Sequence, residues 1–315
     1  MDEFGLIDWI RQQAGPGGGD LRLGIGDDAA VLAVPSGQQL VITTDTLSSG
    51  IHFSPGDPPE SVGHKALAVN LSDLAAMGAQ PRWVLLSVTL PLGSENWIRG
   101  FIRGFLDLAA QFDVRLVGGD TGSGVLSVTV TALGCVEAGR YLVRHGARPG
   151  DLVVVSGCLG DAAYALQSIE GGGTPDPEAL RRLRRPVPRV GLGAALVGKA
   201  SACIDISDGL VADLNHVTDA SGCAAQIEAQ KLPASPALAD CPAAVRYPLQ
   251  LTGGDDYELC FTLPQGTGHV LEDLSRTQDI GLSVIGQILE GSGVRCLGPD
   301  GSELEFETGG YTHQL

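Results

Sequence analysis

Short apolar runs rich in β-branched residues alternate along this chain with longer segments whose apolar residues recur at helical spacing. In the first half, residues 41–44 predict a strand, residues 60–77 a helix and residues 83–90 a second strand. Residues 94–112 predict an amphipathic helix and residues 125–136 a further strand. Such a chain buries its helices against a sheet, so we expect a mixed α/β fold with some α+β character.

A turn cluster at residues 147–151 precedes an apolar run at 152–155 and is the best candidate for a domain boundary. The chain has 315 residues, which is enough for about two domains. We therefore expect one domain over residues 1–148 and a second over residues 149–315. In the second half the pattern predicts helices over 160–170, 175–189 and 208–220, and strands over 202–206, 257–263 and 282–289.

Charge and cysteine content exclude several classes of protein. The 37 acidic residues outnumber the 20 Lys and Arg and give a net charge of −17, the wrong sign for a nucleic-acid partner. No apolar run approaches the roughly 20 residues that span a bilayer. The acidic start lacks the features of a signal peptide, and the seven cysteines are scattered singly. We expect a cytoplasmic protein without a membrane partner.

Six aspartate motifs share one pattern, in which an apolar run is followed by Gly, Ser or Thr and then Asp. We expect each motif to lie where a strand or helix changes into a loop, and the neighbouring glycines to let the backbone approach a phosphate or metal. A single motif of this kind also fits a helix N-cap or an Asx-turn. The motifs are Gly26-Asp27-Asp28, Thr43-Thr44-Asp45, Leu71-Ser72-Asp73, Gly118-Gly119-Asp120, Ile204-Asp205-Ile206-Ser207-Asp208 and Gly253-Gly254-Asp255-Asp256.

The chemistry that these motifs favour is metal-assisted phosphoryl transfer. Carboxylate and hydroxyl oxygens are the hard ligands that Mg²⁺ accepts. The chain has neither a G-x-S-x-G nor an H-E-x-x-H motif, and no Cys/His spacing typical of zinc sites, which removes support for acyl transfer and zinc hydrolysis. Residues 24–29 match a dinucleotide-binding pattern but are expected to form a turn, and the basic run at 181–185 is most simply a solvated helix face.

Together these motifs resemble the thiamine-monophosphate kinase family, part of a superfamily that includes aminoimidazole ribonucleotide synthetase. The most specific segments are residues 24–28, 43–47, 50–53, 65–79, 118–121, 204–210 and 253–259. The resemblance implies a two-domain fold like that of aminoimidazole ribonucleotide synthetase, a homodimer that pairs its N-terminal sheets, and conversion of thiamine monophosphate to thiamine diphosphate with ATP and several Mg²⁺ ions. It implies metal binding, ATP binding and dimerisation for residues 1–148, and completion of the ATP and substrate site for residues 149–315.

The resemblance also assigns roles to individual residues. The implied magnesium ligands are Asp28, Thr43, Thr44, Asp45, Asp73, Asp120, Asp205 and Asp208, some of them through water or backbone oxygen. Among these, Asp45, Asp73 and Asp120 are the implied catalytic residues. The implied ATP contacts are Gly119, Asp120, Arg144 and Ser207, and the implied contacts to thiamine monophosphate are His52, Asp255 and Tyr311. This chain has Asp255 where the family commonly has Glu.

The chemistry of the acceptor indicates direct transfer. The second ionisation of a phosphate monoester lies near pH 6, so its attacking oxygen needs no general base at neutral pH. We expect in-line transfer without a phospho-enzyme intermediate. Two alternatives stay open: another ATP-dependent member of the superfamily, of the aminoimidazole ribonucleotide synthetase or selenophosphate synthetase type, and a non-catalytic, metal-dependent nucleotide-binding protein.

Overall fold

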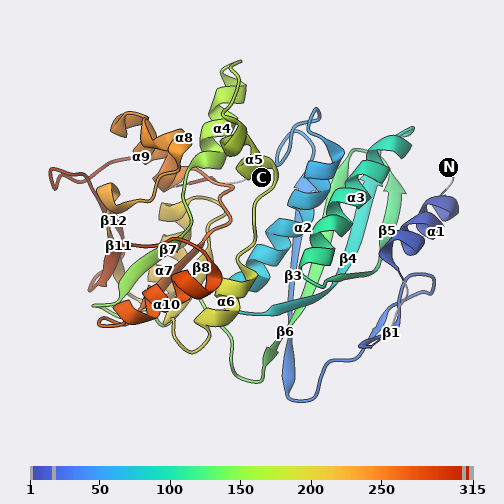
Figure 1. Cartoon of the computed structure of the whole chain (residues 1–315), viewed down its shortest axis with the longest axis horizontal. Coiled ribbons are helices and arrows are strands. Elements are labelled where there is room, and N and C mark those ends of the chain that lie inside the picture. Colours follow the sequence, from blue (N-terminus) through green and yellow to red (C-terminus); the bar gives the residue numbers. More distant parts are fainter. Residues whose placement is uncertain (1–2, 16–18, 307–309, 312–315) are drawn as a thin grey trace. The chain divides into compact units, whose positions relative to one another are not determined.

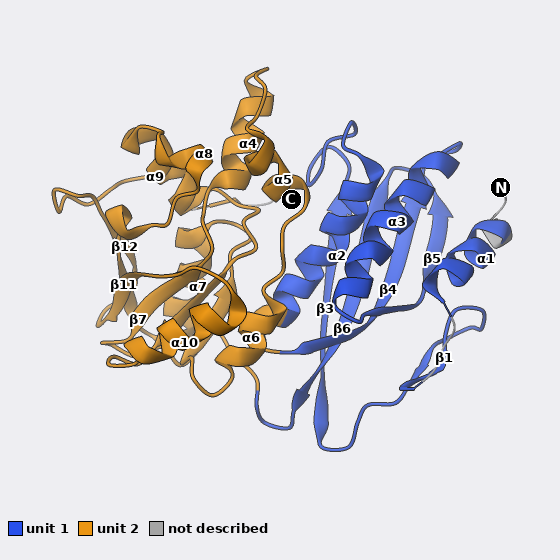
Figure 2. Ribbon diagram, in the orientation of Figure 1, with its two compact units in different colours: residues 1–74, 79–140 blue, residues 75–78, 141–315 orange. Residues whose placement is uncertain are grey.

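The computed structural model describes the chain except for residues 1–2, 16–18, 307–309 and 312–315 (Figure 1). The chain divides into two compact units (Figure 2). Unit 1 comprises Met1–Leu74 and Ala79–Arg140, and unit 2 comprises Ala75–Gly78 and Tyr141–Leu315. None of the described helices is both long enough and apolar enough to cross a membrane.

Unit 1 is built on a four-stranded sheet in the order β3-β6-β4-β5, in which only the β4–β5 pair is parallel. Its strands are β3 (Gln38–Ser48), β4 (Gln80–Leu90), β5 (Arg115–Ser123) and β6 (Ser127–Glu137). The two long helices are α2 (Pro59–Ala76) and α3 (Glu95–Gln111). Helix α1 (Glu3–Ala14) precedes a small ribbon of β1 (Leu21–Leu23) and β2 (Val31–Leu32).

The unit 1 sheet buries one face under its helices, and Figure 1 shows α2 and α3 side by side against that face. The helices approach closely because glycine removes two side chains between them. A Cβ on Gly63 would lie 2.0 Å from the Phe101 carbonyl oxygen, and one on Gly104 would lie 1.9 Å from the Glu60 carbonyl oxygen. On the opposite face Ile42 is 59% exposed. Trp83 and Leu133 of this face pack with Leu21 of β1, whereas the part of the face that carries Ile42 is exposed and apolar.

Unit 2 is built on a six-stranded sheet in the order β12-β9-β11-β7-β10-β8, with β12 and β9 as its parallel pair. Its strands are β7 (Leu152–Ser156), β8 (Ala202–Asp205), β9 (Ala224–Glu228), β10 (Leu259–Leu263), β11 (Leu282–Leu289) and β12 (Gly293–Leu297). Its helices are α4 (Asp161–Glu170), α5 (Pro177–Arg184), α6 (Val190–Leu196), α7 (Leu210–Ser221), the short 3-10 helix η1 (Ala229–Lys231), α8 (Pro236–Ala239), α9 (Ala243–Thr252) and α10 (Gly268–Gln278).

The mixed α/β fold is confirmed, whereas one predicted helix is too long and one strand was not predicted. The helix predicted over 175–189 ends at Arg184, because Pro186 cannot donate a backbone hydrogen bond and disfavours helical geometry in the residue before it. Strand β5 escaped prediction because its glycines resemble a turn, yet it pairs along β4 as an edge strand.

The expected position of the aspartate motifs at element ends is wrong for three of the six. Asp45 lies inside β3, Asp73 inside α2 and Asp120 inside β5. The unit 2 motifs agree with the expectation, since Asp205 ends β8 and Asp255 lies in the loop between α9 and β10. Helix α2 tolerates Asp73 because the carboxylate accepts a hydrogen bond from the Thr43 hydroxyl of β3.

Candidate active site

Strand β3 and helix α2 bring three of the predicted unit 1 residues together. Because side chains alternate along a strand, Thr43 and Asp45 lie on the same face as Ala132 and Val130, which they oppose on β6. Ala132 and Val130 are fully buried, so this is the face under the helices. The Thr43 hydroxyl donates a hydrogen bond to the Asp73 carboxylate of α2. Thr43, Asp45 and Asp73 therefore form one oxygen-rich cluster.

The electrostatics of this cluster suit a cation. Burial and the neighbouring Asp73 charge raise the pKa of Asp45 to about 6. Asp73 also lies in the last turn of α2, which carries no basic residue, and the helix dipole disfavours a negative charge there. A bound divalent cation would relieve both penalties.

The donor atoms of the cluster are compatible with magnesium. Magnesium usually takes one or two carboxylates and completes its shell with water and substrate phosphate. Among the described residues, no group of three or more His, Cys, Asp or Glu side chains is arranged to hold a metal. Two carboxylates and a hydroxyl fit a magnesium ion whose remaining ligands come from the substrates.

Three other predicted residues of unit 1, Thr44, Asp28 and His52, have environments of their own. The Thr44 hydroxyl lies on the open face, 3.1 Å from both the Thr131 hydroxyl and the Val130 carbonyl, so its side chain points away from Asp45. Asp28 is exposed in a bend after β1. The half-buried His52 accepts a hydrogen bond at Nδ1 from the Ser48 amide, 3.0 Å away, which leaves Nε2 as the nitrogen that can donate.

Asp120 is separated from Asp45 by the width of the sheet. Strands β3 and β5 are its two edges, and the register runs from Asp45 through Val130 and Leu86 to Gly119. Three strand spacings amount to about 14 Å. Within one chain, Asp45 and Asp120 are therefore too far apart to ligate the same ion.

In unit 2, the turn between β8 and α7 brings together residues from three parts of the sequence. The Ser207 carbonyl accepts the Asp255 amide at 2.8 Å, and the Asp208 carbonyl accepts the Tyr311 amide at 2.9 Å. Asp205 precedes this turn as the last residue of β8 and is 4% exposed. Ser207, Asp208, Asp255 and Tyr311 are thus neighbours although 104 positions separate the first from the last.

Asp213, which the sequence prediction missed, holds this turn in place. Its Oδ2 accepts the amides of Ser207 and Asp208 at 3.0 Å and that of Gly209 at 3.1 Å. Burial, and then the Asp208 charge, raise the pKa of Asp213 to about 6. A carboxylate within the first turn of a predicted helix was the available signal, because such residues satisfy unpaired amides there.

The loop that carries Asp255 is conformationally strained. Asp255 and Tyr257 have φ angles of 68° and 51°, in the left-handed region that residues with side chains rarely adopt. The Tyr257 hydroxyl donates to Asp255 Oδ1 at 3.0 Å. An open hollow of about 330 Å³, lined by residues of α4 and α9, extends to Gly253 at the start of the loop.

At two of the motif glycines, a side chain would collide with the protein's own backbone. A Cβ on Gly119 would lie 1.8 Å from the Leu86 carbonyl oxygen, and a Cβ on Gly254 would lie 2.5 Å from the Ser207 carbonyl oxygen. The space that the missing side chains leave is filled by the protein's own backbone.

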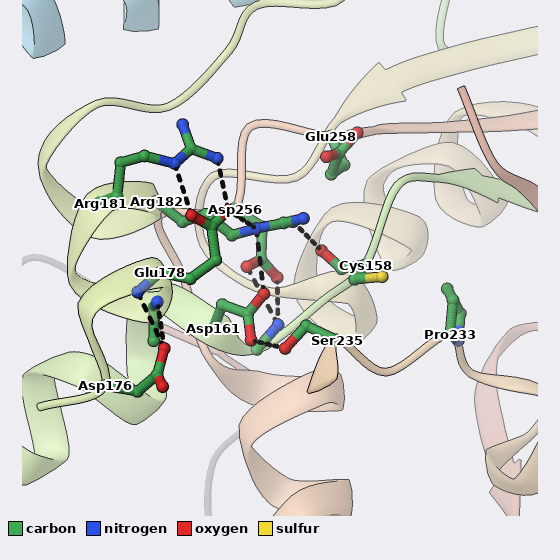
Figure 3. Close-up of polar contacts among 12 residues, drawn as sticks. Cys158, Asp161, Asp176, Glu178, Arg181, Arg182, Pro233, Ser235, Asp256 and Glu258 are labelled. Carbon is green, nitrogen blue, oxygen red and sulfur yellow. Dashed lines mark hydrogen bonds and ion pairs between the residues drawn. The ribbon is translucent and has the colours of Figure 1, made fainter. Parts of the chain in front are cut away.

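Asp256 and Asp161 take part in a group of hydrogen bonds and ion pairs (Figure 3). The Asp256 carboxylate accepts the Gly160 amide, at 3.0 and 2.9 Å to its two oxygens. Arg182 Nε lies 3.1 Å from Asp161 Oδ2, and the Ser235 hydroxyl donates to Asp161 Oδ1. The prediction that the basic run at 181–185 is a solvated face is therefore wrong for Arg182, because α5 turns this side chain toward a buried carboxylate.

Arg144 lies apart from the other predicted residues of unit 2. It is exposed, and its carbonyl accepts the Ser221 hydroxyl at 3.5 Å, at the C-terminal end of α7. Ser207 precedes the N-terminal end of the same helix, which has 12 residues and is therefore about 18 Å long. The backbone of Arg144 is thus remote from the Ser207 turn.

Comparisons with known proteins agree with this architecture. Residues 26–136 match the model of the N-terminal domain of AIR synthase related proteins, and residues 148–297 match the model of their C-terminal domain. Fold and sequence thus define the class, a two-domain AIR synthase related protein.

Similarity to individual proteins narrows the class. The chain is 44% identical to thiamine-monophosphate kinase of Haemophilus influenzae over 300 residues, which are 93% of this chain and 91% of the relative. The crystal structure of thiamine-monophosphate kinase from Stenotrophomonas maltophilia K279a superposes with a TM-score of 0.88 and 46% identity over 96% of this chain and 98% of the other. The structure of AaThiL complexed with AMPPCP and TMP gives a TM-score of 0.77 and 33% identity over 98% and 97%. The chain belongs to the thiamine-monophosphate kinase family.

Proposed function

We propose that the protein transfers the γ-phosphoryl group of ATP to thiamine monophosphate. An oxygen of the acceptor phosphate forms a bond to the γ-phosphorus, the bond to the β–γ bridging oxygen breaks, and thiamine diphosphate and ADP result. The observation that carries this proposal is the similarity over nearly the full length to AaThiL, whose structure contains AMPPCP and TMP. The identity of 44% to a second kinase supports it.

In this proposal the oxygen-rich cluster of unit 1 holds magnesium. Asp45 and Asp73 supply carboxylates and Thr43 a hydroxyl, consistent with the raised pKa of Asp45 beside Asp73. Because Asp120 lies at the other edge of the sheet, it holds a different ion. We assign the further ligand roles to Asp28, Asp205, Asp208 and Thr44, the last through its backbone carbonyl. Magnesium, when bound, neutralises phosphate charge and so lowers the repulsion between two polyanions.

Other residues of the chain bind and orient the two substrates. We assign ATP contacts to Gly119, Asp120, Arg144 and Ser207, and contacts to thiamine monophosphate to His52, Asp255 and Tyr311. The backbone hydrogen bonds that hold Asp255 and Tyr311 to the Ser207 turn support placing these three residues in one site. The residues position the reactants, and transfer is direct because the acceptor oxygen is already deprotonated.

The direct step is tested with ATP labelled at the γ-phosphate. All label is expected in thiamine diphosphate and none in the protein after rapid acid quench. Recovery of an acid-stable or hydroxylamine-sensitive phospho-protein would contradict direct transfer.

We further propose a cytoplasmic homodimer in which residues 1–148 form the metal-binding, ATP-binding and dimerisation domain, and residues 149–315 complete the ATP and substrate site. The exposed apolar face of the unit 1 sheet, with Ile42 at 59% exposure, supports dimerisation through this sheet. All seven cysteines are free thiols, as is usual in a reducing compartment. Light scattering of the wild type and Ile42→Glu tests the dimer, and the variant is expected to dissociate.

The activity is tested by incubating the purified protein with ATP, MgCl₂ and thiamine monophosphate. Thiamine diphosphate and ADP are expected in equal amounts, with no product when magnesium is chelated. ATP binding without product would favour the non-catalytic nucleotide-binding alternative. Turnover of ATP with an aminoimidazole precursor or selenide, and none with thiamine monophosphate, would favour another enzyme of the superfamily.

A further inference from the structure

In the segment from Gly253 to Glu258, residues with strained backbone angles alternate with residues whose side chains anchor the segment. Asp255 and Tyr257 have left-handed φ angles of 68° and 51° and are joined by the hydrogen bond from the Tyr257 hydroxyl. Such backbone conformations cost free energy and persist only where surrounding contacts enforce them. Asp256 lies between the two strained residues and Glu258 follows them. The side chains of Asp256 and Glu258 make the contacts that hold the segment.

The Glu258 anchor is a forked ion pair. Arg189 donates from Nε to Glu258 Oε2 at 2.7 Å and from Nη2 to Oε1. The Ser156 hydroxyl also donates to Oε2, at 2.5 Å. The Glu258 side chain is 3% exposed and that of Arg189 is 22% exposed. An arginine fork fixes the plane of a carboxylate as well as its position, which the point charge of a lysine does not.

Arg189 is itself placed by a rigid part of the chain. It follows Pro186 and Pro188 and forms the N-cap of α6, where its carbonyl accepts the Gly193 amide at 2.9 Å. Proline fixes the backbone angle φ at two of the four positions that lead from the end of α5 to Arg189. The guanidinium therefore extends from a fixed point toward Glu258.

The Glu258 anchor is connected to the proposed substrate contacts through the backbone. The Ile206 amide donates to the Glu258 carbonyl at 2.8 Å, and the Tyr257 amide donates to the Ile206 carbonyl at the same distance. The Asp255 amide in turn donates to the Ser207 carbonyl at 2.8 Å. Displacement of Glu258 would thus release both strained residues from the Ser207 turn.

We propose that Arg189 is a positioning residue that, through its forked ion pair with Glu258, fixes the strained segment 253–258 and so orients the Asp255 carboxylate toward the substrate. This inference rests on the proposed function, in which Asp255 contacts thiamine monophosphate. Arg189 acts through Glu258 and the backbone, at a distance from the reacting atoms.

Steady-state kinetics of Arg189→Gln and Arg189→Lys test the inference. Arg189→Gln is expected to raise KM for thiamine monophosphate at least tenfold and to change KM for ATP less. Arg189→Lys, which keeps the charge and loses the fork, is expected to recover part of this loss. In a double variant with Asp255→Asn the two effects on KM are expected to be less than additive, because both act through one carboxylate. Arg276→Gln, which removes an exposed ion pair with Asp273 in the same unit, is the matched control and should leave both KM values unchanged.

Hydrogen exchange gives a readout that does not depend on turnover. In Arg189→Gln the amides of Asp255 and Tyr257 are expected to exchange at least tenfold faster, while the amides of β10 keep their protection. If the wild type forms no thiamine diphosphate, the proposed function fails, and the exchange result still decides whether Arg189 holds the segment.

Two results would overturn the inference: unchanged exchange at these amides, or faster exchange with an unchanged KM for thiamine monophosphate. If Arg189→Gln does not fold, Ser156→Ala replaces it, since this variant keeps the ion pair and loses one donor to Glu258; because the Ser156 hydroxyl also accepts the Leu259 amide, the reference amides are then those of β10 after Leu259. It is expected to shift exchange and KM in the same direction by a smaller factor, and no shift in either would equally overturn the inference.

Discussion

Asp45 in unit 1 and Glu258 in unit 2 are carboxylates that differ in which charge lies next to them. In unit 1, burial, and then the charge of the neighbouring Asp73, raise the pKa of Asp45 to about 6. In unit 2, Glu258 is held by Arg189 and Asp161 by Arg182. Two negative charges thus lie close together at Asp45 and Asp73, whereas Glu258 and Asp161 are each paired with an arginine of the chain.

This difference separates carboxylates that await a ligand from carboxylates that hold the structure. A charge pair that destabilises the isolated protein persists only where something outside the chain compensates it, and a divalent cation does so. A carboxylate that accepts amides or a forked arginine is satisfied within the fold. We therefore expect removal of the Asp45 charge to stabilise the metal-free protein, and removal of a carboxylate that accepts amides or a forked arginine to destabilise it.

The largest expected effect is the loss of activity in Asp45→Asn. Removing one charge that stabilises the transition state through its metal typically lowers kcat by about 100-fold or more. The variant should stay folded, with a melting temperature equal to or above that of the wild type, because a half-buried like charge is removed. Thiamine diphosphate formation and thermal denaturation measure the two effects. Asp107→Asn, at an exposed position on α3, is the control. Near-wild-type turnover of Asp45→Asn in saturating MgCl₂ would show that Asp45 is not a magnesium ligand.

In unit 2, removal of the Asp213 carboxylate should lower the stability of the protein, which is the opposite of the effect expected for Asp45→Asn. Asp213→Ala leaves the amides of Ser207, Asp208 and Gly209 without their acceptor. We expect the free energy of unfolding to fall by about 3 kcal/mol, since unsatisfied buried donors are costly. Urea denaturation measures the change, and Asp219→Ala on the exposed side of the same helix is the control. Equal stability of the two variants would contradict the structural role of Asp213.

Magnesium should stabilise the protein through unit 1. At a magnesium concentration ten times its Kd, linkage gives about 1.4 kcal/mol of stabilisation. The rise in melting temperature on adding MgCl₂ should be smaller in Asp45→Asn than in the wild type and unchanged in Arg189→Lys, with NaCl of equal ionic strength as the reference. A shift of the same size in Asp45→Asn would show that magnesium stabilises the protein elsewhere.

The smallest expected effect is the pH dependence of the metal-free protein. The folded-state pKa of Asp45 is about 6, above the ordinary value of 3.8 that we expect for the unfolded chain. Between these values the folded state binds the proton more tightly, so this group contributes stability as the pH falls through 6 and loses it as the pH rises. In EDTA, the stability advantage of Asp45→Asn over the wild type should therefore be larger at pH 7 than at pH 5, by on the order of 2 °C in melting temperature. A constant difference would contradict the raised pKa.

Local pattern singled out three residues of unit 1 that the structure places next to one another. The segments around Asp45 and Asp73 are recognisable in the sequence, and the structure brings these two residues together with Thr43. The face that each β3 side chain occupies was not predictable, because the expected strand covered only residues 41–44. The full register of β3 against β6 separates Asp45 from Thr44.

The anchoring residues were missed for a different reason. Arg189 and Glu258 are 69 positions apart, and Ser156 and Glu258 are 102 apart. Each of these residues alone has an ordinary local pattern, and the basic run beside Arg182 resembles any solvated helix face. Only a contact between distant segments gives them a role.

By itself the sequence determined the alternation of strands and helices, the aspartate motifs and the family, because these depend on residues that lie near one another in the chain. Tertiary structure alone decided that Asp45 and Asp120 occupy opposite edges of one sheet, and that Glu258 is neutralised while Asp45 is not. The physical reason is that the partner of a charge is set by strand register and helix packing. These are fixed by contacts across the whole unit, and a local pattern does not contain them.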